Sequence, residues 1–134
     1  MAFLRHIALR TKDMEASRRF YETIGFAFVG YRGRGGLDLS DGTLNMTILQ
    51  YNGTERPPFE EGTEFIHFGI IVEDLASIYN TLRDSGFELI MDNVKKRDDI
   101  DDNKPPERSF KVADPDGNVV DITCEKDEWR GVTV

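Results

Sequence analysis

Two histidines and one strand carboxylate are the residues of this sequence whose types and spacing could do chemistry. His6 and His67 are the only histidines, and each lies in a short apolar run typical of a strand. Asp121 lies inside another apolar run, 119–124. Buried imidazole and carboxylate groups need partners, because their desolvation is costly. Facing one cavity, the three would favour a divalent transition metal with positions open to water, dioxygen or substrate.

An internal repeat accounts for the placement of the two histidines. When His67 is aligned on His6, each residue of the second copy lies 61 positions after its equivalent, without a gap. Asp74 then aligns with Asp13, and the Gly-Phe pair 86–87 aligns with the pair 25–26. Further on, the Asp-Gly pair 116–117 aligns with the pair 41–42 at an offset of 75, so the second copy contains additional residues. We assign these additional residues to the acidic run 97–104, which we interpret as a solvated loop. Such a repeat largely fixes the architecture. We predict an α+β fold of two tandem βαβββ modules that form a cupped mixed sheet around a metal site.

Local signals place the elements that position these residues. In the first module we expect strands at 5–10, 26–31, 37–39 and 44–51, and a helix from the N-cap Asp13 to about residue 24, closed by Gly25. In the second we expect strands at 65–72, 87–94, 109–113 and 119–124, and a helix at 76–84 capped by Asp74. The chain is then a single domain, 1–134, with module one at 1–52, a linker at 53–62, module two at 63–126 and a tail at 127–134.

Composition limits the partners of the chain. The 134 residues carry a formal net charge of −8, with a pI of about 4.7, which disfavours non-specific binding to nucleic acid or anionic lipid. No apolar run approaches the roughly 20 residues that span a membrane, and the first residues do not resemble a secretory signal. The single cysteine, Cys124, is compatible with a reducing compartment. We expect a cytoplasmic protein that binds a small molecule, and neither nucleic acid nor membrane.

Several motifs together resemble the vicinal oxygen chelate superfamily, which includes glyoxalase I, fosfomycin-resistance and bleomycin-resistance proteins, and extradiol dioxygenases. They are the run 6–9 followed by Asp13, the pairs 20–21 and 25–26, His67, and the run 114–122. The last is similar to the closing family motif D-P-D-G-N-x-x-E-L, whose acidic residue is a metal ligand. By this resemblance His6, His67 and Asp121 would be the ligands, with Asp121 standing where the family usually has glutamate.

The resemblance also implies a chemistry and an assembly. The protein would be a metal-dependent enzyme that chelates two oxygens of a small substrate at a 2-His-1-carboxylate site. Such a ligand set with open positions favours Fe(II), while Mn(II), Ni(II) and Zn(II) are the alternatives. We expect a homodimer. Each site is built either within one chain, or from His6 of one chain and the other two ligands of its partner.

Departures from the family pattern bear on the reaction. Glyoxalase I takes a fourth, acidic ligand from the first module, where the repeat register gives Met46, or Ile48 after a slip of two. Extradiol dioxygenases use an additional histidine, and this chain has no third histidine. Fosfomycin transferases have a threonine at the position where this chain has Ala8. We favour a dioxygenase-like enzyme. The alternatives are a glyoxalase-type lyase or isomerase, and a non-catalytic ligand-binding protein similar to those of bleomycin resistance.

Cationic and hydroxyl side chains around the predicted site favour an oxygen-rich, anionic substrate. Period-two alternation places Arg10 on the same strand face as His6. We expect a neighbouring strand to contribute Ser109 and Lys111, with Arg34 as the repeat equivalent of Ser109. The candidate substrate-binding residues are therefore Arg10, Arg34, Ser109 and Lys111. Tyr51 is the candidate catalytic proton donor.

Overall fold

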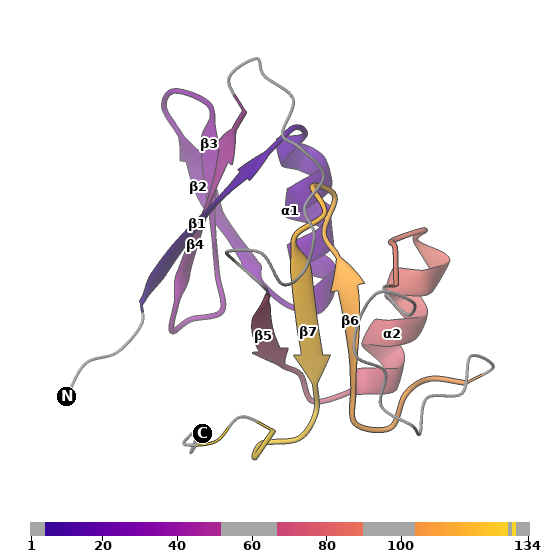
Figure 1. The fold of residues 1–134 in the computed structure, drawn as a ribbon. Helices are drawn as coiled ribbons and strands as arrows, with labels where there is room; N and C mark the ends of the chain where they lie inside the picture. The colour runs from indigo at the N-terminus through magenta and orange to yellow at the C-terminus, as the bar shows by residue number, and fades with distance from the viewer. Residues whose placement is uncertain (1–4, 52–66, 90–103, 129, 131–134) are drawn as a thin grey trace. The chain divides into compact units, whose positions relative to one another are not determined.

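The chain divides into two compact units, Met1–Pro57 and Pro58–Val134, and each carries one copy of the repeat (Figure 1). The computed structural model describes residues 5–51, 67–89, 104–128 and 130. The division falls in the predicted linker 53–62, which lies outside the described residues, as does most of the acidic run 97–104. Unit 1 holds β1 (His6–Thr11), α1 (Met14–Ile24), β2 (Ala27–Arg32), β3 (Gly36–Ser40) and β4 (Asn45–Gln50); unit 2 holds β5 (Phe68–Ile71), α2 (Leu75–Asp84), β6 (Ser109–Ala113) and β7 (Val119–Thr123).

Unit 1 is a four-stranded mixed sheet with one helix. The strand order is β1-β4-β3-β2, with β1 parallel to β4 and the other pairs antiparallel. Alternate residues of the two central strands form the core together with α1, which contributes Phe20 and Tyr21. The strand residues of this core, each at most 1% exposed, are Leu37, Leu39, Met46 and Ile48. The same alternation leaves the other face of the sheet to polar side chains.

Both helices begin at the predicted aspartates. The carboxylate of Asp13 accepts a hydrogen bond from Ala16 N at 3.0 Å, and that of Asp74 accepts one from Ser77 N at 2.9 Å. α1 ends at Gly25, whose φ of 125° is a conformation that residues with a Cβ rarely adopt. In the described part of the chain, no helix has both the length and the apolar character needed to cross a membrane.

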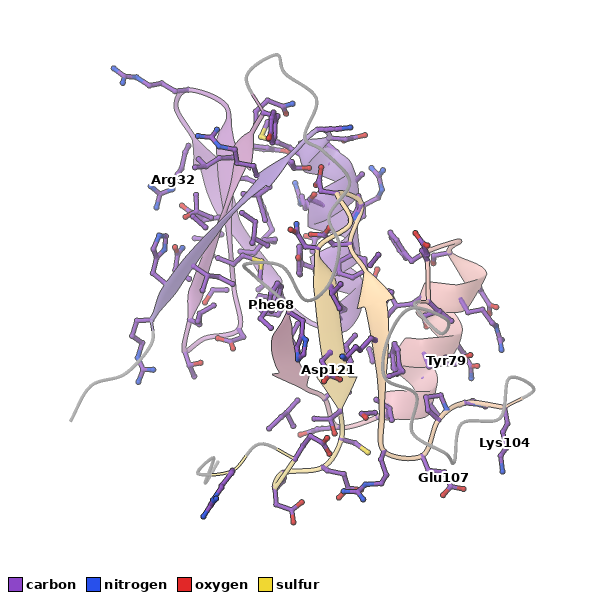
Figure 2. The ribbon with its side chains drawn as sticks, viewed as in Figure 1. Arg32, Phe68, Tyr79, Lys104, Glu107 and Asp121 are labelled. Carbon is purple, nitrogen blue, oxygen red and sulfur yellow. The ribbon has the colours of Figure 1, made fainter. Side chains whose placement is uncertain are left out.

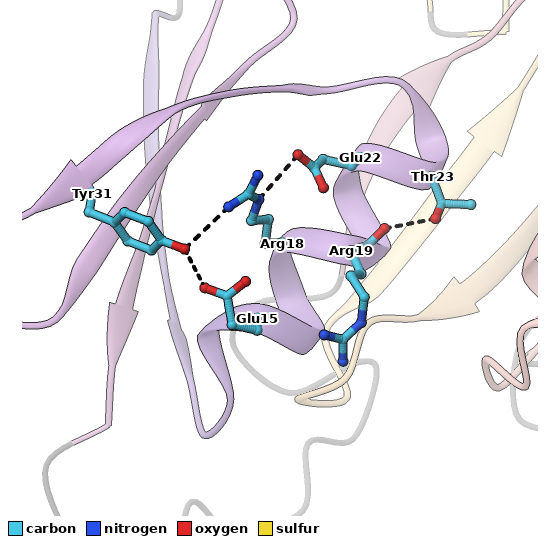
Figure 3. A network of polar contacts seen from close by, with 6 residues as sticks. All are labelled: Glu15, Arg18, Arg19, Glu22, Thr23 and Tyr31. Atoms are coloured by element: carbon cyan, nitrogen blue, oxygen red, sulfur yellow. Dashed lines mark hydrogen bonds and ion pairs between the residues drawn. The ribbon is translucent and has the colours of Figure 1, made fainter.

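A polar network fastens α1 to β2, the outer strand of its sheet (Figure 3). The Tyr31 hydroxyl donates to Glu15 at 2.6 Å and accepts from Arg18 at 3.2 Å. Arg18 also donates to Glu22, one helical turn away, and its guanidinium lies 3.6 Å from the centroid of the Phe28 ring. Tyr31 therefore bonds to the helix through its hydroxyl although 60% of the residue is exposed.

Unit 2 repeats this plan with β5-β7-β6 as its strand order, in which β5 is parallel and β6 antiparallel to β7. The Tyr79 ring of α2 packs edge-on against Phe110 of β6, with centroids 5.1 Å apart. Of the strand predicted at 87–94, the structure describes residues 87–89, where Leu89 forms an isolated bridge with Val112, and the residues from 90 onward lie outside the described part. The order of strands and helices confirms the α+β class and the two βαβββ modules.

Strand register defines which residues of the two units correspond. In unit 1, Thr47 lies level with Ala8 on β1 and with Asp38 on β3. In unit 2, Asp121 lies level with Gly69 on β5 and with Lys111 on β6. The counterpart of Asp121 is therefore Thr47, and the counterpart of Lys111 is Asp38.

This register corrects two predictions. Met46 and Ile48 do not correspond to Asp121, and both lie in the core. The physical reason is that the Asp-Gly pairs used for the alignment hold different places in loops of different length. The pair 41–42 opens the β3–β4 loop, 41–44, whereas the pair 116–117 comes later in the β6–β7 loop, 114–118. The same mismatch makes Gly36, and not Arg34, the counterpart of Ser109.

Candidate metal centre

His67 and Asp121 lie close together in unit 2. His67 Nε2 is 3.9 Å from Asp121 Oδ2, and both side chains are largely shielded, with exposed fractions of 29% and 14%. The separation is too long for a hydrogen bond. It is less than twice the roughly 2.1 Å length of a bond from nitrogen or oxygen to a transition metal. One ion can therefore touch both atoms. β7 is the central strand of the described sheet, so Asp121 does not lie on an edge strand there (Figure 2).

His6 opens β1 with an exposed ring that is held by a neighbouring amide. Its Nδ1 is 2.7 Å from Oδ1 of Asn45, the residue level with it on β4. A side-chain amide oxygen accepts hydrogen bonds and cannot donate them. Nδ1 therefore carries the proton and Nε2 keeps its lone pair, which is how an imidazole is prepared to bind a metal through Nε2.

The three predicted metal ligands belong to different units. His6 is in unit 1, whereas His67 and Asp121 are in unit 2. Among the described residues, no three side chains of histidine, cysteine, aspartate or glutamate gather closely enough to hold an ion. The His67–Asp121 pair and the orientation of His6 each fit the predicted donor set, and the complete triad stays a prediction.

Asp38 lies at the centre of the polar face of unit 1. Its Oδ2 accepts from Arg32 Nε at 2.7 Å, and its Oδ1 accepts from the Thr47 hydroxyl at 2.7 Å. The Asn45 side chain also acts to lower the pKa of this carboxylate. Desolvation alone would raise the pKa of Asp38, but these hydrogen bonds and the charge of Arg32 outweigh it and lower the pKa. Asp38 is therefore a fixed negative charge; Figure 2 marks its partner Arg32 on β2.

The predicted substrate-contacting residues are spread over both units. Lys111 is half-buried and level with Asp121, and Ser109 is buried at the start of β6, level with Thr123. In unit 1, Arg10 donates from Nη1 to the Gln50 carbonyl at 3.4 Å. The remaining two are Arg34, exposed in the β2–β3 turn, and Tyr51, half-buried just after β4.

Sequence reasoning missed the polar residues that surround His6. Asn45 and Thr47 alternate with the apolar Met46 and Ile48, and that period-two pattern marks them as neighbours on one strand face. This alternation can be seen in the sequence. The pairing of Asn45 with His6 and of Thr47 with Asp38, however, depends on the strand order.

Comparison with known proteins defines the class. Residues 3–122 match the Glyoxalase/Bleomycin resistance protein/Dioxygenase superfamily. The match covers most of the chain, and the chain belongs to this superfamily. Among curated proteins, none matches the sequence significantly.

Solved structures share the fold at low sequence identity. A possible glyoxalase from Bacillus cereus aligns with a TM-score of 0.64 and 20% identity, covering 92% of this chain and 100% of its own. The oxidase ChaP-H2 aligns with a TM-score of 0.63 and 15% identity, covering 92% and 94%. A glyoxalase/bleomycin resistance protein/dioxygenase from Alicyclobacillus acidocaldarius aligns with a TM-score of 0.58 and 17% identity, covering 90% and 89%. At these identities the likenesses show the fold alone.

Proposed function

We propose that this chain is a metal-dependent enzyme that binds a small, oxygen-rich, anionic substrate at a site made by His6, His67 and Asp121. The observation that carries the proposal is the His67–Asp121 pair, whose 3.9 Å separation suits a shared ion. The Nε2 lone pair of His6 is the further donor. Two neutral imidazoles and one carboxylate favour Fe(II), with Mn(II), Ni(II) or Zn(II) as alternatives.

When bound, such an ion supplies Lewis acidity and open positions for two substrate oxygens or for dioxygen. The chain's own residues would bind and orient the substrate. Lys111, level with Asp121, and Arg10, on the same face of β1 as His6, offer positive charge to an anionic substrate. Tyr51 is the proposed proton donor, with Arg34 and Ser109 as further candidates for contact. We favour a dioxygenase-like reaction, and a glyoxalase-type lyase or isomerase is the alternative reaction of the same site.

Metal analysis of protein purified without chelator tests this function. We expect about one transition-metal ion per chain, and its loss in His67→Ala and in Asp121→Ala, since each variant removes one donor. Asp84→Ala is the matched control, because this exposed carboxylate lies in α2 and ion-pairs with its neighbour Arg83. Retained iron would direct the next assay to oxygen consumption, and nickel or zinc to isomerase substrates.

The contrary result is also definite. A wild-type chain that holds no metal and takes up none of Fe(II), Mn(II), Ni(II) or Zn(II) would exclude this function. It would favour a non-catalytic ligand-binding protein instead.

A further inference from the structure

A line of hydrogen bonds crosses the polar face of unit 1 and ends at His6. It runs from the ion pair of Arg32 and Asp38, through the Thr47 hydroxyl and the Asn45 amide, to the imidazole. All of these side chains come from neighbouring strands of one sheet. The arrangement lies within one unit, so its geometry does not depend on where unit 2 lies.

The Asn45 amide presents its oxygen to His6. Asn45 Oδ1 lies 2.7 Å from His6 Nδ1, with the Thr47 hydroxyl 3.1 Å away. Asn45 also acts to lower the pKa of Asp38, as an NH2 group on the side of that carboxylate would. An amide oxygen only accepts hydrogen bonds, so the neutral ring of His6 carries its proton on Nδ1.

Unit 2 has a different residue at the position equivalent to Asn45. The register of β5 and β7 pairs Phe68 with Val120, and its extension by one residue places Val119 level with His67. Valine has no side-chain acceptor, so the residue at that position cannot act on His67 as Asn45 acts on His6. Asp121 lies 3.9 Å from the Nε2 of His67.

Burial does not explain the bond between Asn45 and His6. The His6 residue is exposed and water could satisfy its ring. A hydrogen bond to an exposed imidazole adds little to the stability of the fold, because the ring loses rotational freedom when the bond forms. It does select one tautomer and one ring orientation, which are the properties that neighbouring groups control in metal-binding histidines.

We propose that Asn45 is a positioning residue that holds His6 in the Nδ1–H tautomer and directs Nε2 to the metal. The tautomer of His6 is inferred from the geometry of unit 1, whereas the role of Asn45 toward a metal rests on the proposed function. Asp38 and Arg32 lie further away along the same line of hydrogen bonds.

Nitrogen-15 NMR of the metal-free chain tests the tautomer. At a pH high enough that the ring signals no longer change with pH, the two ring nitrogens report which one carries the proton. His67→Ala assigns the signals, since it leaves a single histidine. We expect His6 of the wild type to be protonated on Nδ1, and Asn45→Leu to shift the population toward Nε2–H. A wild type with its proton on Nε2, or an unchanged Asn45→Leu spectrum, would overturn the proposal.

Thr47→Val is the matched control, because it removes a hydroxyl beside the amide and keeps the His6 acceptor. It should leave the tautomer unchanged, whereas a shift equal to that of Asn45→Leu would assign the effect to the whole network and reject Asn45. If Asn45→Leu does not fold, as judged by circular dichroism, Asn45→Ala removes the same acceptor without added bulk, and the wild-type spectrum still decides the tautomer.

Metal titration separates this proposal from the function on which it rests. We expect Asn45→Leu to weaken Zn(II) or Fe(II) binding by about 10- to 100-fold, the usual effect of losing a group that orients a metal-bound histidine. Unchanged affinity in a variant with a shifted tautomer would refute the role toward the metal. A wild type that shows the Nδ1–H tautomer and binds no metal would refute the proposed function while confirming the effect of Asn45 on His6.

Discussion

Individual carboxylates shape both hairpin loops of this chain. Asp41 Oδ1 accepts from the backbone N–H groups of Thr43 and Leu44, and Asp114 Oδ1 accepts from those of Asp116 and Asn118. The two aspartates occupy the same place, Asp41 directly after β3 and Asp114 directly after β6. Each loop is therefore held by hydrogen bonds to one negative charge.

Asp41→Ala should destabilise the chain, and the loss should depend on pH. Desolvation acts to raise the pKa of Asp41, but the hydrogen bonds from Thr43 and Leu44 outweigh it, so the pKa lies below its usual 3.8. A lowered pKa in the fold gives stability that is present above about pH 4 and is lost as the pH falls through the folded-state value. We expect about 1 kcal/mol at pH 7, because the residue is exposed. Chemical denaturation at pH 7 and pH 3 measures this; Asp41→Asn, which keeps an acceptor without charge, should lose the pH dependence.

A buried pair of hydroxyls joins the end of β1 to α1. Thr11 Oγ1 lies 2.7 Å from Ser17 Oγ, and each residue is 1% exposed. Thr11→Val keeps the shape of the side chain but removes this bond and the hydrogen bonds of the hydroxyl with the Asp13 carbonyl and N–H. It should cost about 1 kcal/mol or more of unfolding free energy. Thr81→Val is the control, since its hydroxyl bonds to the Ser77 carbonyl on the exposed side of α2. If urea denaturation showed that Thr11→Val and Thr81→Val lose the same free energy of unfolding, burial would not be the cause of the effect at Thr11.

At the scale of elements, the ends of α1 are set by one side chain and one backbone conformation. Asp13→Ala should lower the free energy of unfolding by about 1 kcal/mol, because it removes the N-cap. Asp13→Asn should restore most of it, since asparagine caps equally well. Thermal unfolding of the two variants measures the difference, and equal melting temperatures would show that the cap contributes nothing.

Gly25 provides the second test of this helix. Its φ of 125° is unfavourable for alanine, although no atom lies within 4 Å of an added Cβ. Gly25→Ala should therefore destabilise the chain by about 1 kcal/mol through the backbone alone. Gly30→Ala, with equal space and no positive φ, is the control and should cost less.

These element ends were predictable because their signals are local. Asp13, Asp74 and Gly25 stand within a few residues of the groups that they cap. Register was harder to predict. The Asp-Gly pairs occupy different places in the two loops, so the alignment through them selected Met46 where the strands place Thr47. His67 near Asp121 was expected from the repeat, whereas the Asn45 contact depends on which strand lies beside β1.

At the scale of the whole molecule, the number of chains bears on the metal centre. We propose that the chain forms a homodimer, with a native mass near twice 15.3 kDa. Light scattering after size-exclusion chromatography measures this mass. A mass of 15.3 kDa would show a monomer and would require each site to be built within one chain.

Mixing two inactive variants decides between the two arrangements of the site. In a dimer whose sites combine His6 of one chain with His67 and Asp121 of the other, a mixture of His6→Ala and His67→Ala contains dimers with one intact site. Metal binding would then return to a fraction of the wild-type level. Sites built within single chains would leave the mixture as poor as either variant alone.

The polar residues that differ between the two modules also bear on how the chain avoids misfolding. Both units use the same strand order, so a folding chain could place a hairpin strand in the wrong sheet. β3 paired with β7 in the equivalent register would set Asp38 opposite Asp121, and like charges directly opposite are destabilising. β6 beside β4 would set Lys111 opposite Thr47 and deprive Arg32 of the carboxylate that it binds. The charges that distinguish one copy from the other therefore disfavour these exchanged pairings.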